Sequence, residues 1–91
     1  FIFAIRFLLT DLPPIINFNL QVINNESISI KVFDMMGRLV NNIHSGTLVA
    51  GNYNFSWDGK IFNNTKASSG TYFLVVSNGV KKDVKKMLLL K

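Results

Sequence analysis

Apolar and polar residues alternate along most of this chain, and turn-forming residues interrupt the alternation roughly every 8–12 positions. In residues 15–22, one face carries Ile16, Phe18, Leu20 and Val22, and asparagine and glutamine fall on the other face. A period of two is typical of strands with one buried face, and no segment has the period of a helix. About seven short strands of this kind predict an all-β fold, an antiparallel β-sandwich.

The later strand-like segments differ in how their apolar residues are distributed between the two faces. Residues 27–34 alternate again, but Phe33 falls on the outer face, so it either covers the sheet or is itself covered. Residues 52–57 place Tyr53, Phe55 and Trp57 on one face. Residues 70–77 are apolar on both faces, which suits a central strand.

Turn-forming residues separate the strand-like segments. In residues 34–38, Gly37 can adopt positive φ at little cost, which predicts a hairpin loop. Residues 39–43 then predict a short strand, followed by a connection over residues 45–51. Asn78-Gly79 predicts a hairpin with a two-residue type I′ turn, because both residues tolerate positive φ.

The chain has 91 residues, enough for one small domain with one core. It does not begin with Met, and we expect a fragment from the C-terminal end of a longer protein. Residues 1–14 are interpreted as a linker or a remnant of an upstream region, and residues 15–91 as the β-sandwich. The apolar stretch at the N-terminus is too short to span a bilayer, which takes about 20 apolar residues, so no transmembrane span is expected.

Positive charge is concentrated at the C-terminal end. The net charge is +5, and five of the ten cationic side chains lie in the last eleven positions: Lys81, Lys82, Lys85, Lys86 and Lys91. Two compatible interpretations stay open: attraction to an anionic partner, and lysines that keep an edge strand from pairing with other sheets. The basic end has no interleaved aromatics and no recognition helix, so nucleic-acid binding is not expected.

Catalytic and metal chemistry find little support in the residue pattern. His44 is the single histidine, and Cys is absent, which rules out disulfide scaffolds and thiolate metal sites. No spacing supports a Ser-His-Asp arrangement, and we expect no enzyme activity and no cofactor. Asp34 and Asp58 each stand at a turn, where calcium binding competes with simple turn capping, and we favour capping.

The three aromatic residues of the 52–57 segment also allow two interpretations. Tyr53, Phe55 and Trp57 are spaced as a platform for carbohydrate or as part of a core. At period-two spacing a core is favoured, with Trp57 packed between two sheets.

Four blocks of the sequence, in order, resemble a known family. They are residues 28–40 (ISIKVFDMMGRLV), 50–59 (AGNYNFSWDG), 67–73 (ASSGTYF) and 85–91 (KKMLLLK). Together they are similar to the type A C-terminal sorting domain of the type IX (Por) secretion system of Bacteroidetes. A related family is the immunoglobulin-like domain of the flagellar hook-capping protein. The resemblance covers about residues 15–91, and residues 12–14 (LPP) stand where the family often has Asn-Pro.

The resemblance implies an immunoglobulin-like sandwich that is a substrate of the export machinery. Such domains direct an attached cargo from the periplasm across the outer membrane to the cell surface or the medium. A sortase-like peptidase then removes them, and the cargo is released or attached to anionic lipopolysaccharide. The family pattern assigns translocon recognition to Lys85, Lys86, Met87, Leu88, Leu89, Leu90 and Lys91, and maintenance of the fold to Gly37, Gly51, Asp58, Gly59, Gly70 and Tyr72.

Two other functions remain open at this point. The domain could be a structural immunoglobulin-like spacer or capping domain of an extracellular protein. It could also be a carbohydrate-binding module, which requires Trp57 to be exposed together with Tyr53 in a groove.

Overall fold

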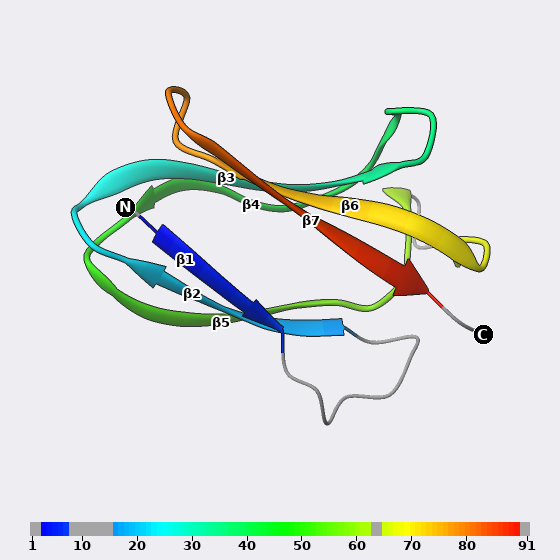
Figure 1. The fold of residues 1–91 in the computed structure, drawn as a ribbon, viewed down its shortest axis with the longest axis horizontal. Coiled ribbons are helices and arrows are strands. Elements are labelled where there is room, and N and C mark those ends of the chain that lie inside the picture. The colour runs from blue at the N-terminus through cyan, green and yellow to red at the C-terminus, as the bar shows by residue number, and fades with distance from the viewer. Residues whose placement is uncertain (1–2, 8–15, 63–64, 90–91) are drawn as a thin grey trace.

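A computed structural model describes residues 3–7, 16–62 and 65–89 of the chain, and these residues form two packed antiparallel sheets (Figure 1). The strands are β1 (Phe3–Phe7), β2 (Ile16–Val22), β3 (Glu26–Asp34), β4 (Leu39–Leu48), β5 (Gly51–Trp57), β6 (Gly70–Ser77) and β7 (Lys82–Leu89). One sheet has the order β1-β2-β5 and the other the order β4-β3-β6-β7. The prediction of an all-β antiparallel sandwich is therefore confirmed.

Strands that follow one another in the sequence do not all lie in the same sheet. The β3–β4 and β6–β7 pairs are hairpins within the four-stranded sheet, whereas β2 and β5 pair with each other in the three-stranded sheet. The chain changes sheets between β4 and β5, which are separated by residues 49–50 alone. The described part of the chain contains no helix that is long and apolar enough to cross a membrane.

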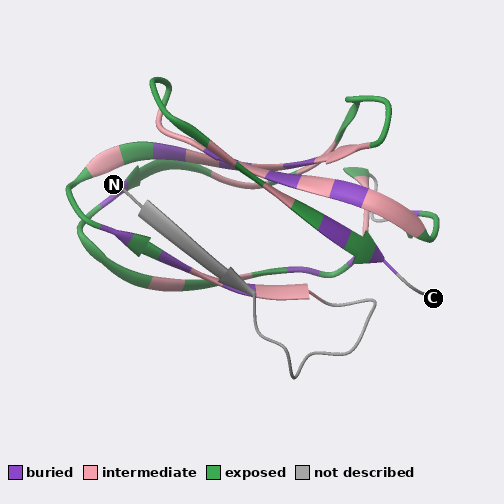
Figure 2. Cartoon of the chain, in the orientation of Figure 1, coloured by how far each residue is buried: buried purple, intermediate pink, exposed green. Residues whose placement is uncertain are grey.

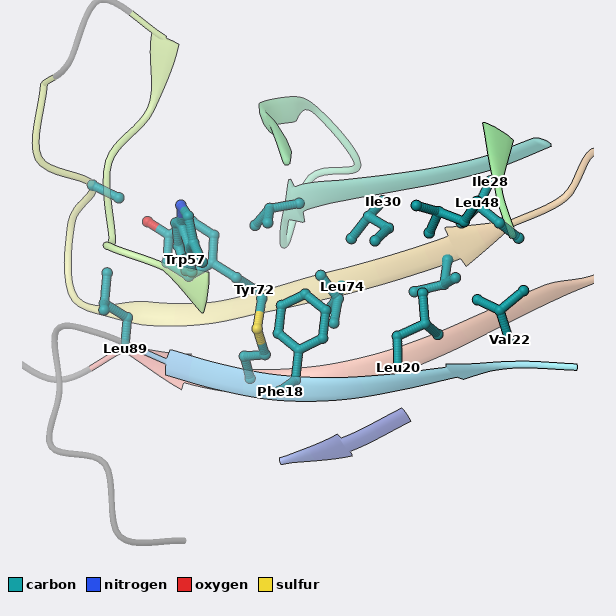
Figure 3. Close-up of a cluster of buried hydrophobic side chains, with 14 residues drawn as sticks. Phe18, Leu20, Val22, Ile28, Ile30, Leu48, Trp57, Tyr72, Leu74 and Leu89 are labelled. Carbon is teal, nitrogen blue, oxygen red and sulfur yellow. The ribbon is translucent and has the colours of Figure 1, made fainter. Parts of the chain in front are cut away.

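The core lies between the sheets and is built from alternate residues of the strands (Figure 3). Phe18, Leu20, Ile30, Leu74 and Leu89 are completely buried. Burial of each large apolar side chain contributes roughly 1.5–3 kcal/mol. Because a strand turns successive side chains to opposite faces, the buried residues alternate with more exposed ones along β2, β3 and β6 (Figure 2).

Strand β4 is longer than the sequence predicts, and the prediction of a short strand followed by a connection over residues 45–51 was wrong. The pairing of β3 with β4 shifts register twice, and Val40 and Ile43 have no partner in β3. Both side chains pack partly buried against the core. Two irregularities of this kind break the period of two, so β4 does not have the sequence pattern of a regular strand.

The β6–β7 loop also differs from its prediction. It has four residues, 78–81, where a two-residue turn was expected. The side-chain oxygen of Asn78 accepts hydrogen bonds from the backbone N–H groups of Val80 (2.9 Å) and Lys81 (2.7 Å). Asn at a turn often closes the chain with its own side chain in this way, which allows a wider loop than a type I′ turn.

Residues 3–7 pair with the first strand of the predicted sandwich. In β1 the register runs from Phe3 opposite Val22 to Phe7 opposite Phe18. Part of the segment assigned to a linker thus adds an edge strand to the three-stranded sheet. The domain boundary at residue 14 stays a prediction, and residues 8–15 lie outside the described part.

Candidate functional site

Strand β7 forms an edge of the four-stranded sheet and contains most of the predicted recognition segment. It pairs with β6 from Ser77 opposite Lys82 to Gly70 opposite Leu89. No described strand pairs with its other side. The backbone groups on that side are therefore a template on which another strand can pair.

The two faces of β7 differ in exposure. Met87 and Leu89 are buried, with exposed fractions of 4% and 0%, and belong to the core. Lys86 and Leu88 stand on the other face and are exposed. Lys85 shares the face of Met87 but is half-buried. The predicted recognition segment therefore divides into residues that anchor the strand and residues that a partner can reach, while Leu90 and Lys91 lie outside the described residues.

The lysines of β7 are not neutralised by ion pairs within the described part of the chain. The ion pairs found there join Arg38 to Asp34 at 2.8 Å and Lys60 to Asp58 at 4.0 Å, both far from β7 in the sequence. The positive charge of the exposed Lys82 and Lys86 is thus available to an anionic partner.

Asp34 shapes the β3–β4 loop, as the capping interpretation predicts. Its Oδ1 accepts hydrogen bonds from the backbone N–H groups of Met36 and Arg38, both at 2.9 Å, and its Oδ2 accepts one from Arg38 Nε at 2.8 Å. The backbone hydrogen bond from Arg38, more than any other cause, lowers the pKa of Asp34 below its ordinary value of 3.8. Gly37 completes the loop with φ of 80°.

Asp58 likewise accepts a hydrogen bond from the backbone of its own turn, from Lys60 N at 3.1 Å. Gly59 follows it with φ of 74° and is buried, so a side chain here would be strained. Within the described ranges no group of three His, Cys, Asp or Glu side chains could hold a metal ion.

Tyr72, another residue assigned to the fold, stands at the same end of the sandwich as Trp57. Its hydroxyl donates a hydrogen bond of 2.7 Å to the carbonyl oxygen of Ser68, and its ring meets Trp57 edge-on with centroids 5.0 Å apart. Gly51 and Gly70 begin β5 and β6, respectively. The fold-maintaining role of these residues stays a prediction.

The aromatic platform is not formed. Trp57 is 1% exposed, and its indole N–H donates to the carbonyl oxygen of Lys60 at 2.9 Å. Tyr53 and Phe55 are half-buried and pack against the core. The condition for a carbohydrate-binding module, an exposed Trp57, therefore fails. His44 also packs against this region, with its ring centroid 5.6 Å from that of Phe55.

An open cleft of about 410 Å³, which the sequence did not predict, lies between the β3–β4 loop and the segment that precedes β6. Arg38, Phe62, Lys66 and Tyr72 contribute to its lining. Its residues come from the β3–β4 hairpin, from residues 61–62 and 66–68 and from β6, so only the folded chain brings them together.

The model of the FlgD Ig-like domain family matches residues 17–81. Among solved structures, FlgD from Pseudomonas aeruginosa is 26% identical, with a TM-score of 0.64, over 88% of this chain and 64% of that protein. Dimeric latent PorU from Porphyromonas gingivalis is 18% identical, with a TM-score of 0.65, over 98% of this chain and 10% of that protein.

The chain thus spans less than two thirds of either structure, and the likeness to PorU concerns the fold alone. A search of curated protein sequences found no match. The structural matches confirm the predicted immunoglobulin-like sandwich, and the family model covers most of the chain. The chain belongs to the FlgD Ig-like domain family.

Proposed function

We propose that this domain is a C-terminal sorting signal that directs export of an attached cargo protein across the outer membrane through the type IX secretion system. The observation that carries the proposal is the division of β7. Met87 and Leu89 fix the strand in the core, while Lys86 and Leu88 face solvent on an edge strand. The four sequence blocks add support, because residues 85–89 of the last block lie in β7.

The domain acts as a substrate and needs no catalytic group of its own. Its partners are the secretion machinery and the sortase-like peptidase that removes the domain. The machinery adds a strand to the free side of β7, so that backbone hydrogen bonds supply affinity and alternate side chains supply specificity. The domain passes through the periplasm, and its cargo reaches the cell surface or the medium, released or attached to lipopolysaccharide.

Charge on the exposed face of β7 contributes to recognition. Lys82 and Lys86 are both exposed, so reversal of their charge leaves the packing of the core unchanged. Lys85 is a poorer choice for such a test, because it is half-buried and its replacement also alters packing. Removal of residues 86–91 is poorer still, because it deletes Met87 and Leu89 from the core.

The test fuses residues 1–91 to a periplasm-targeted fluorescent protein in a Bacteroidetes host with an intact type IX system. Lys82→Glu/Lys86→Glu is compared with Lys66→Glu, which reverses an exposed lysine elsewhere. We expect export of the parent and of Lys66→Glu, and several-fold periplasmic accumulation of the double variant with unchanged thermal stability. Normal export of the double variant would count against an electrostatic role, and periplasmic retention of the parent would count against the sorting function.

A structural spacer or capping domain of an extracellular protein is the second candidate. Membership of the FlgD Ig-like family favours it, since the sandwich alone accounts for that match. The same fusion separates the two candidates: a spacer domain leaves the fluorescent protein in the periplasm, whether or not β7 is altered.

A further inference from the structure

The outer face of the four-stranded sheet carries an apolar patch that the core does not use. Pairing places Phe33 of β3 beside Phe73 of β6, and Lys31 beside Val75. Pairing of β6 with β7 adds Val84 next to Val75. Together with the neighbouring Lys86, which lies opposite Phe73, these residues form the outer patch: Lys31, Phe33, Phe73, Val75, Val84 and Lys86.

The outer patch is partly exposed to solvent. None of its apolar side chains belongs to the core or packs against it. Val84 is 49% exposed, and the patch continues along β7 to Leu88, which is 56% exposed. Phe33 and Phe73 are shielded only in part. Contiguous exposed apolar surface rimmed by polar groups is typical of protein interaction sites.

The charges around the outer patch are positive. Lys31 and Lys86 belong to it, and Lys82 follows on the same face of β7. The described carboxylates lie elsewhere. Glu26 accepts a hydrogen bond from Asn78, and Asp34 is held in its loop by Arg38.

The two remaining described carboxylates also lie away from the outer patch. Asp83 shares the face of Met87, and Asp58 follows β5 of the other sheet. The patch therefore attracts an anionic partner without a competing carboxylate on its own face.

The shape of the molecule selects among anionic partners. The β3–β4 and β6–β7 hairpins both project on the side away from the three-stranded sheet, and the outer face lies between them (Figure 1). Their tips carry Met35, Met36 and Val80, which are 67%, 78% and 91% exposed. A flat bilayer would meet these tips before it reached the patch, whereas a single polypeptide segment fits between them.

We infer that the outer patch binds an acidic segment of a partner protein whose apolar side chains lie on one face. The apolar side chains of the segment cover Phe33, Phe73 and Val75, and its carboxylates lie near Lys31 and Lys86. This inference does not rest on the sorting function, because Lys31 and both phenylalanines lie outside the predicted recognition segment and binding is measured directly.

The test is a titration of the isotope-labelled 91-residue chain, followed by amide chemical shifts. The probes are two synthetic peptides in which Leu alternates with Glu or, as a control, with Lys. We expect the Glu peptide to shift amides of β3, β6 and β7, with an affinity that falls as salt is added. Equal binding of the Lys peptide, no binding of the Glu peptide, or shifts confined to other strands would overturn the inference.

Variants locate the site. Lys31→Glu/Lys86→Glu should weaken binding of the Glu peptide by about fivefold, since each of the two charges contributes roughly 0.5 kcal/mol. Lys66→Glu should leave the affinity unchanged. Vesicles containing phosphatidylglycerol test the alternative partner: binding to them that depends on Met35 and Met36, with no response to the Glu peptide, would assign the face to a lipid surface instead.

Discussion

The two faces of the four-stranded sheet are built from alternate residues of the same strands, yet they differ in what they contribute. The inner face places Leu74 and Val76 in the core, completely buried. The outer face leaves Phe73 and Val75 partly exposed to solvent. Because successive side chains of a strand point to opposite faces, the same strands can build the core on one face and leave the other face accessible to a partner.

The largest effect should come from neighbouring positions on the two faces of β6. Leu74→Ala removes a completely buried side chain and should lower the free energy of unfolding by about 2–5 kcal/mol, through lost burial and the cavity that remains. Val75→Ala should lower it by less than about 1 kcal/mol, because its methyl groups are already partly in water. Urea unfolding measures the free energy of unfolding of both variants. Similar losses for the two variants would contradict the difference between the inner and outer faces.

A smaller loss of stability is expected when one hydrogen bond of Tyr72, on the inner face of β6, is removed. Tyr72→Phe keeps the ring against Trp57 but removes the hydroxyl that donates to the carbonyl oxygen of Ser68. The free energy of unfolding should fall by about 0.5–1.5 kcal/mol. Tyr53→Phe is a matched control, because the Tyr53 hydroxyl donates to the carbonyl oxygen of Val49 in an exposed turn. Its effect on the free energy of unfolding should be smaller than that of Tyr72→Phe.

The smallest effect should depend on pH and disappear in acid. The lowered pKa of Asp34 means that the unfolded chain takes up a proton more readily than the folded one. Its contribution to stability is therefore complete above the ordinary value of 3.8 and is lost as the pH falls through the lowered folded value. Thermal melts of the parent and of Asp34→Asn should converge in that range. A difference between the two that is independent of pH would contradict this account.

Two strands could be predicted from the sequence for different reasons. Strand β2 was found because residues 16–22 alternate with a period of two, and β6 because residues 70–77 form a short run that is apolar on both faces. Strand β4 could not be predicted, because Val40 and Ile43 both turn toward the core across two register shifts. Asn78-Gly79 located a turn correctly, but its hydrogen bonds close four residues rather than two.

The candidate site was predicted in part. The sequence indicated a basic terminal strand, yet pairing alone shows which of its residues are anchors and which are exposed. The outer patch was missed because its residues are far apart in the chain. Phe33 was placed on the outer face from alternation, but its neighbour Phe73 follows only from the register of β3 with β6.

The most direct test of the central claim compares two adjacent positions of β7, Met87 and Leu88, as alanine variants of the cargo fusion. The measurement is the exported fraction together with the free energy of unfolding. We expect Met87→Ala to lower stability by about 2 kcal/mol or more, because the side chain is buried. Leu88→Ala should lower stability by less than about 1 kcal/mol and still reduce export. Normal export of Leu88→Ala, or equal destabilisation by both variants, would contradict the separation of recognition from stability on this strand.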